Sequence, residues 1–288
     1  MNPAVVLYRE LVMGGHLLAL GTSSMAAASA LLLGMQPTFV LLLMAYLFSY
    51  GAYMMNRTSD IEQDEVSNPA RTSHLRGRKR YLPMIVGLCF VLGYGMALLV
   101  SFVFFIALLV PLILSVAYSV GSKRLVPLLG ASRLKQKLLV KNLAISLGWS
   151  LIPLLVGLYY SELTAALLFL SPFIFMRLMV NTILFDVRDV RADVNYGVRT
   201  LPIAYGTATS FRLMSLIDLA SIFYIVTIAA TSAMGAYAIS FLALPLYSLI
   251  YRTTLANHQS RINFVCDFVA DGEYVLWGPL LYLGKIFI

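Results

Sequence analysis

One stretch of the chain passes without a break from an apolar segment into an acidic one. Residues 163–193 read LTAALLFLSPFIFMRLMVNTILFDVRDVRAD, and the acidic end carries Asp186, Asp189 and Asp193. The apolar part, 163–185, is long enough for a helix that crosses a membrane, which needs about 20 residues at a rise of ~1.5 Å each. If the helix continues, the three aspartates lie within an arc of ~60°. The stretch therefore predicts a membrane helix that ends in clustered oxygen ligands.

The rest of the chain is equally poor in charge. Of its 288 residues 60% are hydrophobic and only 12% are charged, whereas a soluble domain has about 25% charged residues. We therefore expect an all-α integral membrane protein with nine transmembrane helices, arranged as two four-helix repeats around a central chamber. The predicted helices are 12–33, 38–55, 82–100, 102–120, 139–160, 163–185, 211–233, 235–252 and 271–288.

The basic residues lie together between the apolar segments. Of the 21 lysines and arginines, all except Arg177 and Lys285 fall at Arg9 or in the polar ranges 56–81, 121–141, 186–212 and 252–261. The positive-inside rule makes this face cytoplasmic. Topology therefore explains the net charge of +8, and we expect no nucleic-acid partner. We expect a multi-pass protein with its functional site opening on this face.

A second acidic cluster follows the predicted helix 38–55. It holds Asn56, Asp60 and Asp64, which share an arc of ~80° if the helix continues. Four predicted helices separate the two clusters. This spacing predicts one membrane domain, 1–288, with pseudo-repeats at about 38–160 and 163–288 and an additional helix at 12–33.

The acidic residues suggest bound cations, since like charges one helical turn apart repel one another. Mg²⁺ typically takes one or two carboxylates, waters and substrate phosphates. Two clusters at one membrane interface therefore predict Mg²⁺, two ions in number, which clamp a diphosphate and stabilise the charge on its leaving group. The alternative is ordinary solvated loop acids. The predicted metal ligands are Asn56, Asp60, Asp64, Asp186, Asp189 and Asp193.

These motifs resemble those of the UbiA superfamily of intramembrane prenyltransferases, NxxxDxxxD and a run similar to DxxDxxxD. Pro69 and Arg71 match the tail of the first motif, and Gly197-Val-Arg199-Thr200-Leu201-Pro202 resembles the segment after the second. Tyr118 and Lys123 resemble a tyrosine and a lysine of the middle loop in that family. The residues after Arg71, Thr72-Ser73-His74, depart from the family pattern and leave the acceptor open.

The resemblance implies a Mg²⁺-dependent transfer of an isoprenyl chain from an allylic diphosphate donor to a lipophilic acceptor within membrane lipid. The acceptor would be an aromatic quinone precursor or an archaeal-type glycerol lipid, and the modest chain length fits a prokaryotic cell membrane. The implied diphosphate-binding residues are Arg71, Lys123, Tyr118 and Arg199. The implied catalytic residues are Asp60, Asp64, Asp189, Asp193, Tyr118 and Lys123.

A transporter or ion-coupled carrier that uses the acidic clusters is the alternative function. Carriers of this kind bind near the bilayer midplane, often between inverted repeats. Here the acids gather at one interface, and a period of four helices makes the repeat parallel. The sequence therefore favours the enzyme.

Several polar residues fall within or beside the apolar segments. Arg177 and Asp218 lie at similar depths in neighbouring predicted helices, which predicts a buried ion pair between them. The alternative is that Arg177 reaches the diphosphate. His16 is either a packed histidine or a general base for the acceptor, and His74 is a candidate substrate contact. Cys89 and Cys266 are expected to be free thiols.

Overall fold

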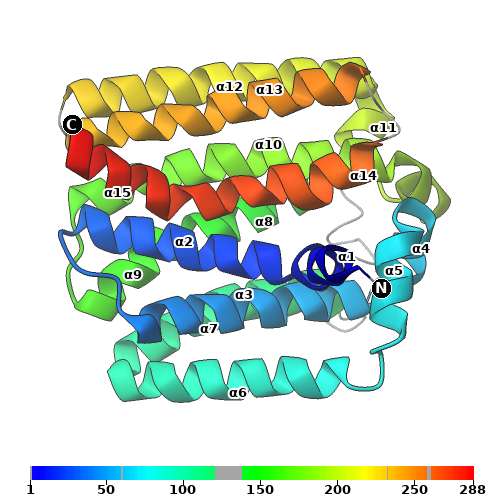
Figure 1. Cartoon of the computed structure of the whole chain (residues 1–288), viewed down its shortest axis with the longest axis horizontal. Coiled ribbons are helices and arrows are strands. Elements are labelled where there is room, and N and C mark those ends of the chain that lie inside the picture. Colours follow the sequence, from blue (N-terminus) through cyan, green and yellow to red (C-terminus); the bar gives the residue numbers. More distant parts are fainter. Residues whose placement is uncertain (1, 60, 121–137, 232, 258–260) are drawn as a thin grey trace.

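A computed structural model of the chain describes residues 2–59, 61–120, 138–231, 233–257 and 261–288, and in these ranges it is helical without strands (Figure 1). The N-terminal half contains α1 (Pro3–Tyr8), the π-helical turn η1 (Arg9–Met13), α2 (His16–Leu32), α3 (Phe39–Ser59), α4 (Ile61–Ser67), α5 (Pro69–Arg76), α6 (Leu82–Val100), α7 (Phe102–Val120), α8 (Val140–Ser150) and α9 (Ile152–Tyr160). The C-terminal half contains α10 (Ala165–Asn195), α11 (Leu201–Tyr205), α12 (Thr207–Ala230), the 3₁₀ turn η4 (Ala236–Leu242), α13 (Ala243–Asn257), α14 (Ile262–Phe264), the π-helical turn η6 (Val265–Ala270), the 3₁₀ turn η7 (Glu273–Leu276) and α15 (Trp277–Phe287).

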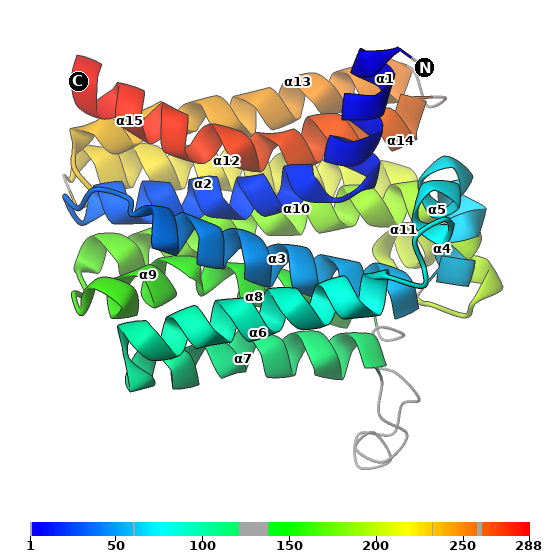
Figure 2. The ribbon, with the colours of Figure 1, turned by 60° about the horizontal axis from the view of Figure 1, so that its bottom comes forward.

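The long helices run side by side in a bundle, as the two views in Figures 1 and 2 show. The short helices α4, α5 and α11 gather at one end of this bundle, close to the N-terminus, and the C-terminus lies at the other end. Both acidic motifs belong to the end with the short helices, because α4 holds part of the first motif and α10 runs through the second directly before α11.

Helix α10 forms the centre of the bundle. Of its apolar stretch 67% is buried, against 22–33% for the other long apolar helices. Phe173 of α10 packs against Phe241 and Trp277, with ring centroids 5.8 and 5.4 Å away. Burial of these large rings holds α10 against η4 and α15 by the hydrophobic effect and ring packing. The second acidic motif thus belongs to the most deeply buried of the long apolar helices.

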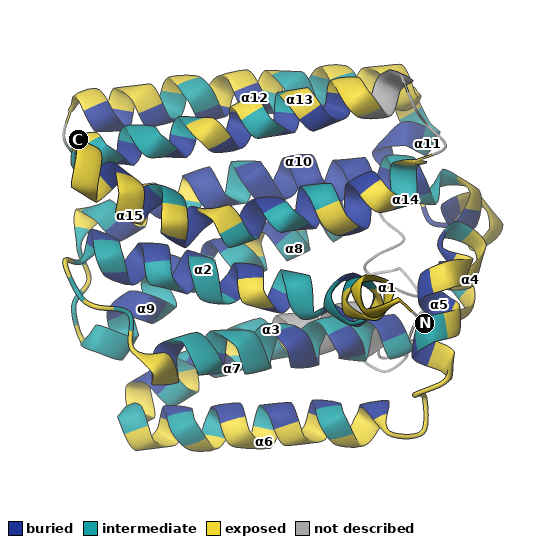
Figure 3. Ribbon diagram, viewed as in Figure 1, coloured by how far each residue is buried: buried dark blue, intermediate teal, exposed yellow. Residues whose placement is uncertain are grey.

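Figure 3 shows that the outer helices expose much of their surface, and many of their exposed side chains are large and apolar. Leu99 and Phe223, for example, expose 89% and 74% of their surface. Within the described ranges, five helices are long and apolar enough to cross a membrane, or six if Pro3–Met13 and His16–Leu32, bent by 63°, form one span. An apolar exterior of this kind fits lipid as the solvent. The chain is an integral membrane protein.

The predicted ranges all meet helical segments, but their boundaries differ. Helix α10 continues ten residues beyond the predicted end at 185, so the second motif is helical as expected. The range 139–160 is divided into α8 and α9, with Pro153 near the start of α9. The last range is also divided, into η7 and α15. The count of nine spans and the two four-helix repeats stay predictions.

The first motif does not follow one continuous helix, which corrects the prediction of a single ligand face. Helix α3 ends at Ser59, and α4 leaves it in a different direction (Figure 1). The Thr58 hydroxyl donates to the carbonyls of Met54 and Met55 at 3.0 and 2.9 Å. Such back-bonding by a threonine weakens a helix end. Asn56 and Asp64 therefore belong to different helices.

Candidate active site

A cavity of about 350 Å³ runs inside the bundle, mainly between α3, α8 and α10. It follows α3 from Leu41 to Asn56, a distance of about 22 Å along a helix. One part of its wall is polar and contains Asn56, Arg57, Gln63, Asp64, Lys141, Asn181, Arg188, Asp189, Asp193 and Asp271. The rest is apolar, with side chains such as Leu41, Met44, Phe48, Phe104, Trp149 and Val156. A cavity with these two kinds of wall suits a ligand that has a charged head and an apolar tail.

Asp64 is a residue of the first motif that lines the polar end of the cavity. Nη1 of Arg57 donates to both of its oxygens, at 3.1 and 2.9 Å, and Nη2 of Arg71 lies 3.6 Å from Oδ2. Burial alone would raise the pKa of the Asp64 carboxyl, but the two guanidinium groups outweigh it and hold the pKa below its ordinary value. Asp64 is therefore charged at neutral pH.

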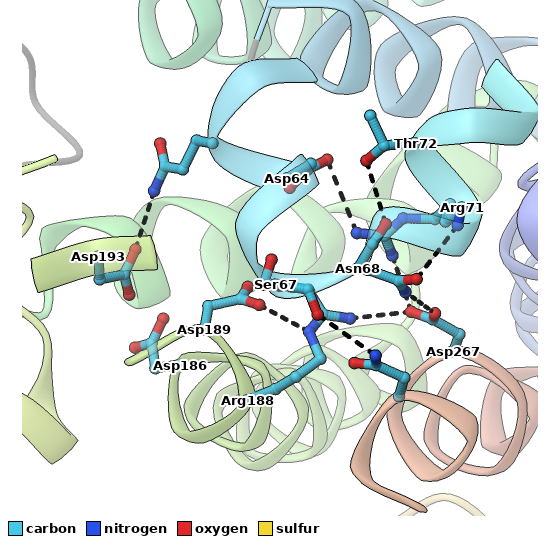
Figure 4. A network of polar contacts seen from close by, with 12 residues as sticks. Asp64, Ser67, Asn68, Arg71, Thr72, Asp186, Arg188, Asp189, Asp193 and Asp267 are labelled. Carbon is cyan, nitrogen blue, oxygen red and sulfur yellow. Dashed lines mark hydrogen bonds and ion pairs between the residues drawn. The ribbon is translucent and has the colours of Figure 1, made fainter. Parts of the chain in front are cut away.

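Asp189 and Asp193 bring the second motif to the same cavity. Arg188 donates through Nε and Nη2 to the two oxygens of Asp189, at 2.7 and 2.8 Å. Gln63 of α4 donates to Oδ1 of Asp193 at 2.9 Å and so joins the two motifs (Figure 4). Within the described ranges, Oδ2 of Asp193 is buried and has no hydrogen-bond partner. Carboxylate oxygens without partners are costly to bury, which favours a cation at this position.

Asp186 is placed differently from the other acids of its motif. Its carboxylate is fully buried and accepts from Lys141 and Asn142 of α8, each at 2.8 Å. It does not line the cavity, although the helix through the motif is continuous. The pairing holds α8 against α10, and Lys141 itself lines the cavity.

Asp267 of η6 is a residue of the site that the sequence analysis missed. Its Oδ1 accepts from Nη1 of Arg71 at 2.7 Å and from Nη1 of Arg188 at 2.8 Å, and its Oδ2 accepts from Asn68 (Figure 4). The partners lie 196, 79 and 199 residues away in the chain, so no local spacing marks them. The available signal was a lone acid in an apolar run, residues 262–270, INFVCDFVA.

The remaining predicted site residues are distributed as follows. Asp60 and Lys123 lie outside the described residues, and so does the side chain of Tyr118, whose backbone belongs to α7. Arg71 is fully buried behind Asp64 and does not line the cavity, and Arg199 is exposed away from it. Of the predicted metal ligands, Asn56, Asp64, Asp189 and Asp193 line the cavity.

The polar residues of the apolar segments also have defined positions. Arg177 pairs with Asp218, which confirms the predicted buried ion pair. The ring of His16 stacks on Tyr50 at 4.7 Å, its Nδ1 lies 2.5 Å from the hydroxyl of Tyr46, and it does not line the cavity. His74 lies 3.9 Å from a carboxylate oxygen of Glu10, also outside the cavity wall. Both cysteines are free, as expected.

The sequence matches a known protein family over most of its length. The model of the UbiA prenyltransferase family matches residues 14–268, which is most of the chain and includes both acidic motifs. This protein belongs to the UbiA prenyltransferase family. Membership makes it a prenyltransferase, and its apolar helices place it in a membrane.

Solved structures of UbiA proteins share this fold at low sequence identity. A UbiA homologue from Archaeoglobus fulgidus bound to GPP and Mg²⁺ has a TM-score of 0.63 at 14% identity, over 95% of this chain and 98% of that one. A homologue from Aeropyrum pernix K1 without ligand has a TM-score of 0.64 at 14% identity, with the same coverage. A structure from work on digeranylgeranylglyceryl phosphate synthase has a TM-score of 0.56, again at 14% identity and with the same coverage. No curated protein matches the sequence.

Proposed function

We propose that this UbiA protein uses Mg²⁺ to transfer an isoprenyl chain from an allylic diphosphate to a lipophilic acceptor. The observation that carries the proposal is the cavity, which has acidic and basic side chains from both motifs at one end and an apolar wall along the rest. The charged end suits a diphosphate with its metal ions, and the apolar part suits an isoprenyl tail. Family membership adds support against a transporter.

The residues at the polar end fit Mg²⁺ that is shared with a substrate. Among the described residues, no three carboxylate, histidine or cysteine groups form a ready-made metal site. Mg²⁺ does not need one, because it typically binds one or two carboxylates and completes its shell with phosphates and water. Asn56 and Asp64 would hold it from one side, and Asp189 and Asp193 from the other. Asp60 completes the proposed set, and Asp186 would support it from behind through Lys141.

The chemistry proposed here divides between the two parts of the cavity. When bound, Mg²⁺ supplies positive charge that stabilises the departing diphosphate. Lys141, at the cavity wall, adds a positive charge close to the phosphates. We propose the same role for Lys123 and Arg199, and we propose that the Tyr118 hydroxyl donates a hydrogen bond to the phosphates. Arg71 would act from behind by holding Asp64. The apolar wall keeps water away from the allylic cation until the acceptor attacks it.

The acceptor would enter the same cavity from the membrane. The apolar wall includes aromatic rings of Phe48, Phe90, Phe104 and Trp149. We propose an aromatic quinone precursor or an archaeal-type glycerol lipid as its class. One of the similar structures comes from work on a glycerol lipid enzyme, which makes that class worth testing beside the aromatic one. The clustering of basic residues supports a cytoplasmic opening of the site.

The experiment uses the full chain in detergent with labelled geranylgeranyl diphosphate. Diphosphate release and labelled lipid would be followed with a panel of both acceptor classes, with and without Mg²⁺. We expect Mg²⁺-dependent transfer to one class, and a loss of at least about a hundredfold in Asp189→Asn, because the metal contributes several kcal/mol to such a step. The matched control is Arg191→Gln, an exposed residue of the same helix. Failure to bind any isoprenyl diphosphate would contradict the proposal.

A further inference from the structure

Arg57 is paired with the carboxylate of Asp64, the group of the first motif that we propose as a metal ligand. It follows Asn56 directly in α3, and its Nη1 contacts both oxygens of Asp64. Its guanidinium also lies over the ring of Tyr53, 4.8 Å from the centroid. The side chain is 10% exposed and the residue lines the cavity, and its buried Nε has no hydrogen-bond partner among the residues that the structure describes. Arg57 thus has an unused donor beside the polar end of the cavity.

Arg188 pairs in a similar way with a carboxylate of the second motif. It precedes Asp189 directly, and its fork covers both oxygens of that carboxylate. Its guanidinium lies over the ring of Phe185, 4.5 Å from the centroid, and its side chain is 1% exposed although the residue lines the cavity. A third bond, from Nη1, ties it to Asp267. Arg188 can therefore release Asp189 and remain anchored.

These two arginines and the proposed metal ions need the same oxygens. Both oxygens of Asp64 and both of Asp189 already accept from a guanidinium. A cation that binds there must weaken these pairs, and a buried guanidinium that loses its carboxylate is costly unless another anion replaces it. A diphosphate at the polar end is such an anion, since its oxygens suit the fork of arginine.

We propose that Arg57 and Arg188 are diphosphate-binding residues that exchange partners, from Asp64 and Asp189 to the diphosphate. The exchange couples the binding of the metal ion to the binding of the diphosphate. The arginines oppose metal binding until a diphosphate accepts their hydrogen bonds. By linkage, the metal then strengthens diphosphate binding by the same factor. The protein avoids holding metal ions without a donor, and Asp267 is a positioning residue that keeps Arg188 within reach. This inference rests on the proposed function.

The test measures binding by the full chain in detergent, without turnover. Mn²⁺ replaces Mg²⁺ because free Mn²⁺ can be counted by electron paramagnetic resonance, and inorganic diphosphate replaces the donor head group. Mn²⁺ affinity is measured with and without diphosphate in wild type, Arg57→Gln, Arg188→Gln and Arg188→Lys. Arg191→Gln is the matched control, an exposed arginine of the same motif. Thermal unfolding of each variant checks that it is folded.

In wild type we expect diphosphate to raise Mn²⁺ affinity about tenfold or more, within the range of typical coupling energies. Each Gln variant should bind Mn²⁺ alone about fivefold more tightly, and its coupling factor should fall by a similar amount. Arg188→Lys keeps the charge but loses the fork, so Mn²⁺ alone should still bind more tightly than in wild type. Arg191→Gln should match wild type.

Two results would overturn the exchange while leaving the proposed function intact. The first is a wild-type protein that binds Mn²⁺ and diphosphate with the same coupling factor as both Gln variants. The second is an Arg188→Lys variant whose Mn²⁺ affinity equals that of wild type. The positive charge alone, without the fork of arginine, would then explain the results of the Gln variants. A wild type that binds neither probe would instead contradict the proposed function, and the exchange with it.

Discussion

Arg177 of α10 and Asp218 of α12 form an ion pair inside the bundle, and both side chains are fully shielded from solvent. Glu273 accepts two further bonds from Arg177, at 2.8 and 2.9 Å. Asp218 also accepts from Arg252 at 2.5 Å. The cluster thus joins α10, α12, α13 and η7 by charges that lipid cannot solvate. The stability of the protein should therefore depend on the pairing of each positive charge with a negative one.

Loss of the Asp218 charge should destabilise the protein strongly. Asp218→Asn leaves Arg252 without its carboxylate and removes one partner of Arg177. We expect a loss of about 3–5 kcal/mol in the free energy of unfolding, as for other broken buried pairs. Thermal unfolding in detergent measures it. The control is Glu65→Gln, which removes the exposed pair between Glu65 and Arg76 and should cost under about 1 kcal/mol. Equal melting temperatures for wild type and Asp218→Asn would contradict the prediction.

Asp267 should contribute more to the stability of the protein than its neighbour Asn263, although both residues connect the same two parts of the chain. Asp267→Asn removes the charge that holds Arg71 and Arg188, so we expect a cost of about 3 kcal/mol or more. Asn263 donates one uncharged bond to the carbonyl of Ser67 at 3.2 Å, and Asn263→Ala should cost about 1 kcal/mol. Chemical or thermal unfolding of both variants compares them. Similar losses in the two variants would mean that the charge of Asp267 adds nothing.

The carboxylate of Asp64 should make stability depend on acidic pH. Its pKa in the folded state lies below the ordinary value of 3.8, because Arg57 and Arg71 outweigh the effect of burial. A group with a lowered pKa contributes stability that is fully present above the unfolded-state pKa and is lost as pH falls through the folded-state value. We expect the melting temperature of wild type to fall more steeply below about pH 4 than that of Asp64→Asn. Parallel pH curves for the two proteins would contradict this expectation.

A large side chain in place of Ala45 should limit the cavity to donors with a shorter isoprenyl chain. Ala45 lines the cavity eleven residues before Asn56, about 16 Å away along α3. Ala45→Phe should lower kcat/KM for geranylgeranyl diphosphate relative to geranyl diphosphate by about tenfold or more, since misfit of a few carbons in an apolar pocket has that effect. The lipid-facing variant Leu99→Phe is the control. An unchanged ratio in Ala45→Phe would show that the tail lies elsewhere.

His16 should not act as the base for the acceptor. Its ring is stacked on Tyr50 and hydrogen-bonded to Tyr46, away from the cavity wall. We expect single-turnover transfer by His16→Gln to stay within about twofold of wild type, whereas loss of a general base typically costs 10²–10⁴-fold, roughly. A hundredfold drop in a folded variant would restore the catalytic interpretation.

The local sequence determined which segments of this protein form helices and, to a large extent, where along the chain these helices lie. Apolar runs predicted the long helices because a membrane requires every backbone polar group to be satisfied within the helix. The second motif remained helical as far as Asn195, as its spacing indicated. Depth along two neighbouring helices was enough to predict the pair of Arg177 and Asp218, since rise per residue is constant.

Only the tertiary structure decided which charges meet. Asp267 joins Arg71 and Arg188 over 196 and 79 residues of chain, and no local pattern encodes such a contact. Asp186 shares a helix with Asp189 but turns to Lys141 of α8, because the packing of the helices, not the spacing, sets its surroundings. Asn56 and Asp64 likewise belong to two helices, α3 and α4, that run in different directions, although both residues line one cavity. Sequence thus determined helices and motifs through short-range geometry, whereas the pairing of buried charges depended on how distant helices pack.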